Sequence, residues 1–322
     1  GPIGESILEK YGDKYTILVP ALPVNKRVVS EGILYVDGIP LHMSHMKDHP
    51  LTPMWESDIA KLMEPQAKYE SFKVNKEMLK ESKEDILEKL DEFGKTRKHF
   101  YVIPDFVEDE DARKIVEVFG DLKVLTGGSG LMTELAKRHG KNATRSSIVS
   151  SKTKGPALIL AGSSSKATLG QVVHFIKSGK KALRMEPLNL IDGSQTIDDI
   201  WNFVVENKDE DILIYSSASP DEVKKNQEAG RERVASLLEN TTALIAKRAA
   251  KNGFNRIIVA GGETSGAVTK SLGFDAYIIG ESVAPGVPIM VPLNNRDFRL
   301  VLKSGNFGQE DFFIRALEMT GE

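Results

Sequence analysis

The chain has no cysteine among its 322 residues. This absence excludes a disulfide scaffold, a thiolate zinc site and a cysteine nucleophile. It also fits a reducing compartment, so we expect a cytoplasmic protein. An excess of basic charge is missing as well, because 43 Lys and Arg stand against 46 Asp and Glu, for a net charge of −3. Proteins that bind nucleic acid or membranes usually carry a basic excess or patch, so we expect neither partner.

Long hydrophobic runs are also absent. The longest apolar runs have the length of strands, so we predict no transmembrane helix. The first residues, Gly1–Ile7, show neither the basic head nor the apolar core of a signal peptide. The chain is nevertheless long, and 322 residues exceed the usual size of one domain, so we expect two. These features together favour a protein that acts on a small molecule.

The first half mixes strand-length apolar runs with amphipathic helical patterns. Asp37-Gly38 lies between two alternating stretches, Val28–Val36 and Ile39–Met43, and predicts a β-hairpin. Lys83–Phe93 carries apolar residues on one helical face and predicts a helix. Further predicted strands are Tyr15–Ala21, His99–Pro104 and Leu122–Leu125.

The second half alternates strands and helices more regularly, with one long helical stretch over Pro220–Lys251. Such alternation predicts a mostly parallel sheet with helices on both faces. The predicted strands are Ala157–Ala161, Lys181–Met185, Asp211–Tyr215, Arg256–Ala260, Ala276–Ile279 and Phe298–Leu302.

A serine-rich, basic stretch, Lys141–Gly155, separates the two halves and has the composition of a linker. We therefore predict an N-terminal domain over residues 1–140, a linker over 141–155 and a C-terminal domain over 156–322. Both domains are expected to be α/β, each a mostly parallel sheet flanked by helices, with the antiparallel hairpin in the first.

The most informative loop follows the predicted strand Arg256–Ala260. It runs Gly261, Gly262, Glu263, Thr264, Ser265 and Gly266 and then continues as a helical pattern. A strand, a glycine turn and a helix N-terminus together form an anion site, because first-turn N–H groups lack intrahelical partners and the helix dipole adds positive charge. Thr264 and Ser265 supply hydroxyl donors. Glu263 is interpreted either as a carboxylate on the magnesium side or as a favourable acid near a helix start.

Two other loops repeat this chemistry. Ser163 and Ser165 follow one predicted strand, and Lys303, Gly305 and Asn306 follow another. Ligands of parallel sheets bind beyond the carboxyl ends of the strands, where these loops fall. A P-loop and a dinucleotide fingerprint are both missing. The prediction of a nucleotide site therefore depends on the convergence of several loops.

The first half offers candidates for a second ligand. His42, His45, Asp48 and His49 form a metal-like cluster, but the hairpin and proline context favours a surface or substrate loop over zinc. Two prolines stiffen the stretch with His49 and Thr52, which is a candidate substrate wall. The loop with Gly128 and Ser129 is either a tight turn or a ligand contact. We list these four residues, His49, Thr52, Gly128 and Ser129, as substrate-binding candidates.

Taken in order, these segments resemble the four-carbon acid sugar kinase family, once catalogued as a domain of unknown function. The resemblance extends over the whole chain and implies a kinase with two α/β domains, the first for a sugar acid such as threonate, erythronate or 3-oxo-tetronate and the second for ATP. It implies that Ser163, Ser165, the Gly261–Gly266 loop and the Gly305 loop contact ATP, with Mg²⁺ as cofactor. The segments are Val19–Arg27, Gly32–Gly38, His49–Met54, Thr126–Leu131, Ala161–Ser165 with Thr168 and Gln171, Gly261–Gly266, Ala284–Pro288 and Lys303–Gly308 with Asp311–Phe313.

The chain departs from the family pattern at its start. Family members open with an Asp-Asp-Phe-Thr-Gly-Ala motif that is missing here, as is a later Asp-Ser-Thr segment. We expect a member without its first βα units that binds nucleotide but turns over poorly alone, and that pairs with a separate N-terminal fragment or with itself. The catalytic base is not identified. Two alternatives are an incomplete nucleotide-binding fragment or sensor module, and a phosphosugar oxidoreductase or isomerase.

Overall fold

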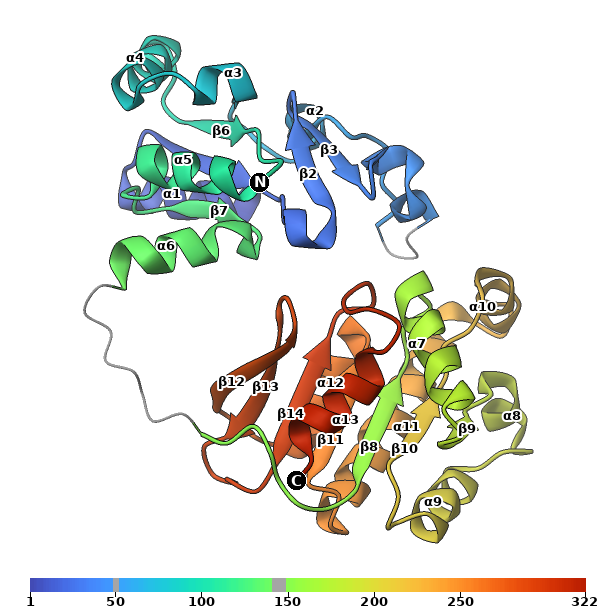
Figure 1. Cartoon of the computed structure of the whole chain (residues 1–322). Helices are drawn as coiled ribbons and strands as arrows, with labels where there is room; N and C mark the ends of the chain where they lie inside the picture. Colours follow the sequence, from blue (N-terminus) through green and yellow to red (C-terminus); the bar gives the residue numbers. More distant parts are fainter. Residues whose placement is uncertain (49–51, 141–148) are drawn as a thin grey trace. The chain divides into compact units, whose positions relative to one another are not determined.

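The structure is a computed structural model that describes residues 1–48, 52–140 and 149–322. The chain divides into two units, Gly1–Thr144 and Arg145–Glu322, and each is treated by itself (Figure 1). Both units are α/β, and the main sheet of each is mostly parallel, as the sequence predicts. In the described part of the chain no helix is long and apolar enough to cross a membrane.

The N-terminal unit contains a four-stranded parallel sheet in the order β5-β6-β1-β7 and a separate antiparallel sheet β2-β3-β4. Its strands are β1 (Tyr15–Val19), β2 (Arg27–Ser30), β3 (Ile33–Val36), β4 (Ile39–Pro40), β5 (Ser71–Val74), β6 (Phe100–Pro104) and β7 (Leu125–Gly127). Its α-helices are α1 (Pro2–Tyr11), α2 (Ile59–Met63), α3 (Lys76–Leu79), α4 (Lys83–Gly94), α5 (Asp109–Phe119) and α6 (Met132–His139). Short 3₁₀ helices are η1 (Pro23–Asn25), η2 (Leu41–Met43), η3 (His45–Asp48) and η4 (Ser129–Leu131).

The core of this unit forms where α4 and α5 pack against the sheet. Every residue of β6 is buried, as expected for a strand covered on both faces. Ile86 and Leu90 of α4 are fully buried in the same cluster, one helical turn apart. The predicted helix Lys83–Phe93 is confirmed almost to the residue, because its apolar spacing matches the face that the fold buries.

The predicted hairpin at Asp37-Gly38 is confirmed as the pair β3–β4, and it belongs to a three-stranded meander. The stretch Val28–Val36 does not form one strand, because the chain turns at Glu31 and Gly32 before it turns again at Asp37 and Gly38. All four turn residues have positive φ, between 52° and 76°, as two-residue hairpin turns require. Leu41–Met43, predicted as strand, is a 3₁₀ helix.

A buried carboxylate explains why a glutamate occupies the first of these turns. Asp105, 1% exposed at the end of β6, accepts hydrogen bonds from the N–H groups of Glu31 (2.9 Å) and Gly32 (3.0 Å). It also accepts one from the N–H of Lys76 at 3.1 Å. These bonds hold Glu31 in a left-handed conformation that a residue with a side chain seldom adopts.

The C-terminal unit contains a seven-stranded sheet in the order β12-β13-β14-β11-β8-β10-β9. Its strands are β8 (Ala157–Ala161), β9 (Lys181–Arg184), β10 (Ile212–Tyr215), β11 (Arg256–Ala260), β12 (Tyr277–Ala284), β13 (Val287–Pro292) and β14 (Arg299–Lys303). Its helices are α7 (Lys166–Lys177), α8 (Pro187–Asp192), α9 (Ile197–Glu206), α10 (Pro220–Gln227), α11 (Arg231–Lys251), α12 (Gly262–Leu272) and α13 (Phe312–Thr320).

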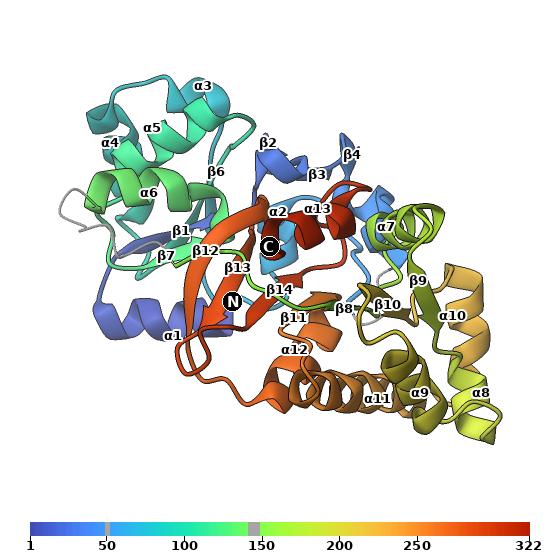
Figure 2. The same cartoon turned by 60° about the horizontal axis from the view of Figure 1, so that its bottom comes forward.

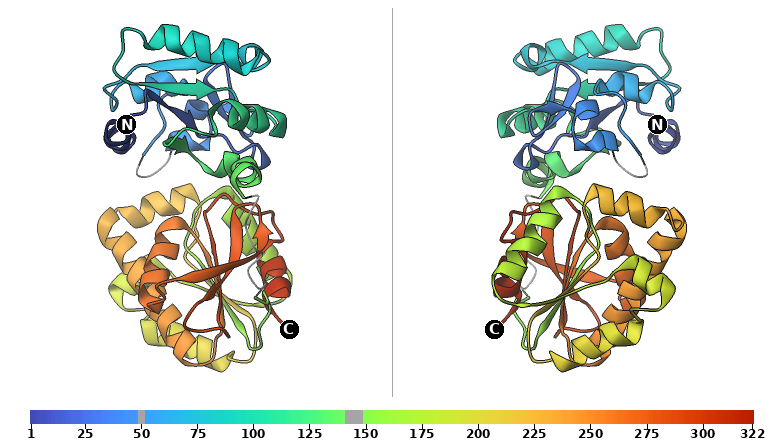
Figure 3. Two further views of the ribbon diagram at one scale, coloured as in Figure 1. Left: turned by 90° about the vertical axis from the view of Figure 1, so that its left-hand side faces the viewer. Right: turned by 90° about the vertical axis from the view of Figure 1, so that its right-hand side faces the viewer.

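Helices cover both faces of this sheet (Figure 3). Helices α7 and α13 pack with Ile159 of β8 on one face, whereas α9, α11 and α12 pack with Leu158 and Leu160 on the other. Figure 2 shows α9 and α12 beside the long helix α11. Successive residues of β8 therefore enter different cores, which is why the strand is a continuous apolar run.

Two predictions in this unit are corrected. The helical stretch Pro220–Lys251 is two helices, because the chain breaks at Gly230, where φ is 103°. The short strand predicted at Ala276–Ile279 belongs to a longer antiparallel pair, β12 and β13. The strand β13 was not predicted, because it contains prolines at positions 288 and 292 and proline is unusual within a strand. The strand β12 lies at the edge of the sheet and pairs only with β13.

The start of the C-terminal unit includes the last part of the predicted linker. Residues 141–148 lie outside the described residues, but Thr153 is buried and its N–H donates to Thr320 O at 2.8 Å. Its hydroxyl donates to Asp297 O at 2.8 Å. The segment before β8 is therefore anchored to the end of α13.

Candidate functional site

The candidate nucleotide site lies where three parallel strands end side by side. β8, β11 and β14 are neighbours in the sheet, so their carboxyl ends share one edge. The chain leaves β8 through α7 on one face and leaves β11 through α12 on the other. This divergence makes the β8/β11 boundary a topological switch point, the usual ligand position in an open α/β sheet.

The loops that follow these strands touch one another closely. A Cβ atom added to Gly162 would lie 2.3 Å from Thr264 Oγ1, and one added to Gly305 would lie 2.2 Å from Ser163 Oγ. Both distances are impossible for real atoms, so only glycine allows the loops to approach this far. The structure thus brings together the three loops whose convergence the sequence predicts.

The loop after β11 turns at Gly261 and begins α12 without a side-chain cap. Gly261 has φ 130° and its N–H donates to Lys303 O at 3.0 Å, which joins this loop to β14. Gly262 and Glu263 are exposed, and a Cβ on Gly262 would have nothing within 4 Å. The start of α12 is therefore open to a ligand, and its uncapped N–H groups and helix dipole suit an anion.

The loop after β8 is organised by its own serines. Ser165 caps α7 by accepting from Thr168 N at 3.2 Å, and its hydroxyl donates to Gly305 O at 2.6 Å. Ser163 Oγ accepts from Ser165 N at 3.2 Å. Both predicted ATP-binding serines therefore also shape the loops, so their substitution would alter loop geometry.

Lys303 lies beneath these loops and is 1% exposed. Its ammonium donates to Thr168 Oγ1 at 2.8 Å and to Gly305 O at 2.9 Å. Both acceptors are neutral, and in the described chain no carboxylate lies within ion-pair distance of it. Burial lowers the pKa of Lys303 to about 7. The lysine thus holds the Gly305 loop through a hydrogen bond to its backbone. The predicted contact of Lys303 with phosphate stays a prediction.

Gln171 was missed as a site residue by reasoning from chemistry, although it falls in the family-like segment. It is fully buried on α7, and its Nε2 lies 3.0–3.1 Å from the carbonyls of Phe307, Gly308 and Gln309. The amide therefore holds residues 307–309 of the loop after β14, whereas Lys303 holds Gly305 of the same loop. The only sequence signal is a polar residue on the apolar face of a predicted helix.

In the N-terminal unit, the glycine loop after β7 is pressed against the end of β1. A Cβ on Gly127 would lie 2.3 Å from Val19 O, and one on Gly130 would lie 2.2 Å from Ala21 O. Between them Gly128 and Ser129 are exposed. The loop is a tight turn that presents two of the candidate substrate residues at the carboxyl edge of the sheet.

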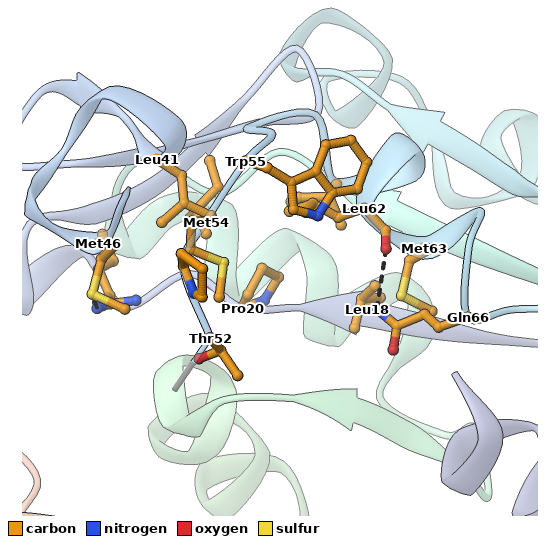
Figure 4. A pocket seen from close by; sticks show the side chains of 14 residues that line it. Leu18, Pro20, Leu41, Met46, Thr52, Met54, Trp55, Leu62, Met63 and Gln66 are labelled. Carbon is orange, nitrogen blue, oxygen red and sulfur yellow. Dashed lines mark hydrogen bonds between the residues drawn. The ribbon is translucent and has the colours of Figure 1, made fainter. Parts of the chain in front are cut away.

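A pocket of about 430 Å³ lies in the same unit (Figure 4). Figure 4 shows Leu41, Met46 and Met54 on its left and Leu62 and Met63 on its right. Most of its walls are apolar. It is lined by Leu18, Pro20, Arg27, Leu34, Leu41, Met46, Thr52, Pro53, Met54, Trp55, Ile59, Leu62, Met63 and Gln66.

The four candidate substrate residues are not gathered in this pocket. Thr52 lines it, whereas Gly128 and Ser129 do not, and His49 lies outside the described residues. Of the histidines in the metal-like cluster, His42 contacts Ser57, and its Nδ1 lies 2.7 Å from the Oγ of Ser57. That contact occupies one ring nitrogen with a hydroxyl.

Two family models match the chain. One, described as a nucleotide-binding C-terminal domain, matches residues 158–313, and the other, a sugar-binding N-terminal domain, matches residues 1–135. With the switch-point loops, these matches define a two-domain protein that combines a nucleotide-binding and a sugar-binding unit. The chain belongs to the four-carbon acid sugar kinase family.

Proteins of similar sequence match this chain over its whole length. A 3-oxo-tetronate kinase of Brucella melitensis is 35% identical over 332 aligned positions, and one of Cupriavidus necator is 37% identical over 326. Both matches cover 100% of this chain and 75% of the relative. A crystal structure from Haemophilus influenzae has TM-score 0.70 at 33% identity, covering 99% of this chain and 77% of that one. A Salmonella typhimurium structure has TM-score 0.80 at 32% identity, covering 98% and 76%.

Proposed function

We propose that this protein is an ATP-dependent kinase that phosphorylates a hydroxyl of a four-carbon sugar acid. The observation that carries the proposal is the meeting of three loops at the switch point of the C-terminal sheet, in the range that matches a nucleotide-binding domain. Relatives of similar sequence along the whole chain are 3-oxo-tetronate kinases. They favour an active kinase over a sensor module or a catalytically incomplete fragment.

The C-terminal unit is proposed to bind ATP by its phosphates. A Cβ added to Gly262 in the first turn of α12 would have nothing within 4 Å, so this uncapped helix start has room for a phosphate. Further proposed contacts come from the flanking loops and the rest of α12's first turns: Ser163, Ser165, Gly261, Glu263, Thr264, Ser265, Gly266, Lys303, Gly305 and Asn306. Transfer of a phosphoryl group depends mostly on positioning and on neutralising charge, which N–H donors and hydroxyls supply.

Mg²⁺ is proposed to accompany the nucleotide, where it would neutralise phosphate charge. Glu263 fits this role because it is the acidic residue in the first turn of α12 and is exposed. The protein's own residues would hold the triphosphate still while the acceptor oxygen forms its bond to the γ-phosphorus and the bond to the leaving ADP oxygen breaks.

The N-terminal unit is proposed to bind the acid, with 3-oxo-tetronate first among the substrates because the relatives carry that name. His49, Thr52, Gly128 and Ser129 remain the proposed contacts, and Thr52 lies on a pocket of suitable size. Residues 1–140, 141–155 and 156–322 are the proposed sugar-acid domain, linker and ATP domain. Cytoplasmic location, and pairing with itself or with a separate N-terminal fragment, stay predictions.

Calorimetry with MgATP on three matched chains tests the nucleotide site. Gly262→Asp adds a carboxylate where a phosphate is expected, and Gly262→Asn adds a side chain of the same shape without charge. Because a Cβ fits freely at Gly262, neither change disturbs packing. We expect the affinity of Gly262→Asp for MgATP to be about tenfold or more lower than that of Gly262→Asn, because the added carboxylate repels the phosphates. Equal affinities of the two variants would place the phosphates elsewhere.

Transfer itself is tested by following ADP release with 3-oxo-tetronate, threonate or erythronate as acceptor. Acid-dependent ADP release that Gly262→Asp abolishes would establish the kinase. Nucleotide binding without release for any of the acids would instead favour the sensor alternative.

A further inference from the structure

The pocket of the N-terminal unit contains a cation that has no counterion among the described side chains. Arg27 is the first residue of β2 and lines the pocket. The one hydrogen bond of its guanidinium among the described residues runs from Nη2 to Met46 Sδ at 3.8 Å. Thioether sulfur is a weak acceptor, and a guanidinium has five N–H donors in a fixed fork. Most of these donors therefore have no acceptor among the described residues.

Among the side chains that the structure describes, which exclude those of residues 48–51 and 141–148, no acid lies within ion-pair distance of this guanidinium. Asp37, the one acid whose charge acts appreciably on Arg27, pairs with the exposed Lys26 at 3.7 Å instead. Arg27 is half-buried, and burial lowers its pKa, an effect that the charge of Asp37 opposes only in part. A charged group is usually withdrawn from water only when it is paired. For Arg27, the described side chains supply no such partner.

The walls around Arg27 suit a ligand with one charged end. Leu34, Leu41 and Met46 line the pocket beside it, and Trp55 is 62% exposed although it lies on the wall. Apolar walls lower the local dielectric, which strengthens a single ion pair. Small-molecule pockets typically combine such walls with a few placed polar groups, and Thr52 is another of these.

The position in the fold also fits a ligand. Leu18 and Pro20, at the carboxyl end of β1, form part of the same pocket, so Arg27 stands at the edge of the sheet where α/β ligands bind. The residue lies in the range that matches a sugar-binding domain. Four-carbon sugar acids carry one carboxylate, the group that a guanidinium fork grips in two parallel hydrogen bonds.

We propose that Arg27 binds the carboxylate of the acceptor acid, and so selects hydroxy acids over neutral sugars of the same length. The carbon chain of the acid then lies along the apolar walls, with its hydroxyl end away from Arg27. This assignment rests on the proposed function, because it names the part of the N-terminal unit that recognises the acid.

Binding by the full chain, without nucleotide, tests the assignment. The probes are threonate and threitol, which share a four-carbon polyhydroxyl chain but differ in the carboxylate. Three variants are compared: Arg27→Met removes the charge and keeps an unbranched side chain, Arg27→Lys keeps the charge without the fork, and Lys26→Met removes a neighbouring exposed charge as the matched control. Circular dichroism confirms that each variant is folded.

We expect the unchanged chain and Lys26→Met to bind threonate and to leave threitol unbound. Arg27→Met should lower the affinity for threonate by about thirtyfold or more. The affinity of Arg27→Lys should lie between those of Arg27→Met and the unchanged chain. Equal affinity of Arg27→Met and the unchanged chain for threonate would overturn the assignment, and so would failure of the folded unchanged chain to bind threonate. MgATP titrated into the same samples separates this failure from that of the nucleotide site, which lies in the other unit.

Discussion

At the scale of single residues, Lys303 shows how burial changes the role of a side chain. The sequence places a lysine beside a glycine loop, which favours a solvated phosphate ligand. The structure buries it under the loop against neutral acceptors on α7 and at Gly305. No sequence pattern reveals this, because the burial comes from elements that are more than 130 residues apart.

The buried lysine predicts a specific pH dependence of stability. Its pKa is about 7 in the folded chain against an ordinary 10.5, so between these values the unfolded chain binds the extra proton. The free energy of unfolding therefore rises as the pH increases from 7 toward 10.5. Below pH 7 the lysine is charged in both states, and the folded chain bears the full cost of burying the ammonium. Lys303→Met removes the effect. Its stability advantage over the unchanged chain should shrink by on the order of 2 kcal/mol between pH 7 and pH 9.

Urea unfolding at pH 6, 7 and 9 measures that advantage. Thr269→Val, also on the C-terminal unit but hydrogen-bonded only within α12, is the control and should show no such trend. A constant difference between Lys303→Met and the unchanged chain across this range would mean that the lysine stays charged throughout.

Arg27 is a second residue whose role is not predictable from the sequence alone. The residue falls in a segment that resembles the family, yet its type and position alone do not distinguish a ligand-binding arginine from a surface one. The distinction comes from what surrounds it in three dimensions, namely an apolar pocket in which no described acidic side chain lies within ion-pair distance.

At the scale of elements, periodic segments were predictable and turns less so. The helix α4 and the strands β8 and β11 follow directly from their apolar spacing. The turn at Glu31 and Gly32 was not predictable, because glutamate rarely adopts positive φ and the carboxylate that holds it lies 74 residues away in sequence.

Asp105 should therefore be a main support of the β2–β3 turn. Asp105→Asn leaves one acceptor and places an amide donor where backbone N–H groups converge. We expect it to destabilise the chain by about 2 kcal/mol, since charge-assisted hydrogen bonds in a buried position are lost. Thermal and urea unfolding measure the change. Asp37→Asn, an exposed turn residue, should alter stability by less than about 0.5 kcal/mol. Similar effects of the two substitutions would contradict the role of Asp105.

The same scale explains what was predictable of the nucleotide site. Each glycine loop was visible in the sequence because it follows an apolar strand. Their convergence depends on strand order, in which β11 lies between β8 and β14, and order is a property of the whole sheet. Gln171 and Thr168 become part of the site only through that order.

At the scale of the whole molecule, each unit has cores of its own. One buried cluster lies within residues of the N-terminal unit, and two lie within the C-terminal unit on opposite faces of its sheet. Separate cores predict separate folding, because each unit buries its own apolar faces without the other.

Residues 149–322 alone should therefore fold and bind MgATP. We expect one cooperative unfolding transition and an affinity within about threefold of the full chain, since the proposed contacts all lie in this unit. Urea unfolding and calorimetry on the fragment provide the measurement. The same fragment with Gly262→Asp is the control and should lose binding. A fragment that lacks a cooperative transition, or that folds without binding, would contradict separate domains with these roles.

The contact between Ser165 and Gly305 spans 140 residues. A ribosome delivers β8 and α7 long before it delivers β14, so for much of synthesis the serine loop exists without the loop that completes the site. Lys303 ends β14, the strand that pairs with β11 on the side away from β8. The proposed ATP site is thus incomplete until β14 has been made, and a chain released before that point gains no stability from the nucleotide around it.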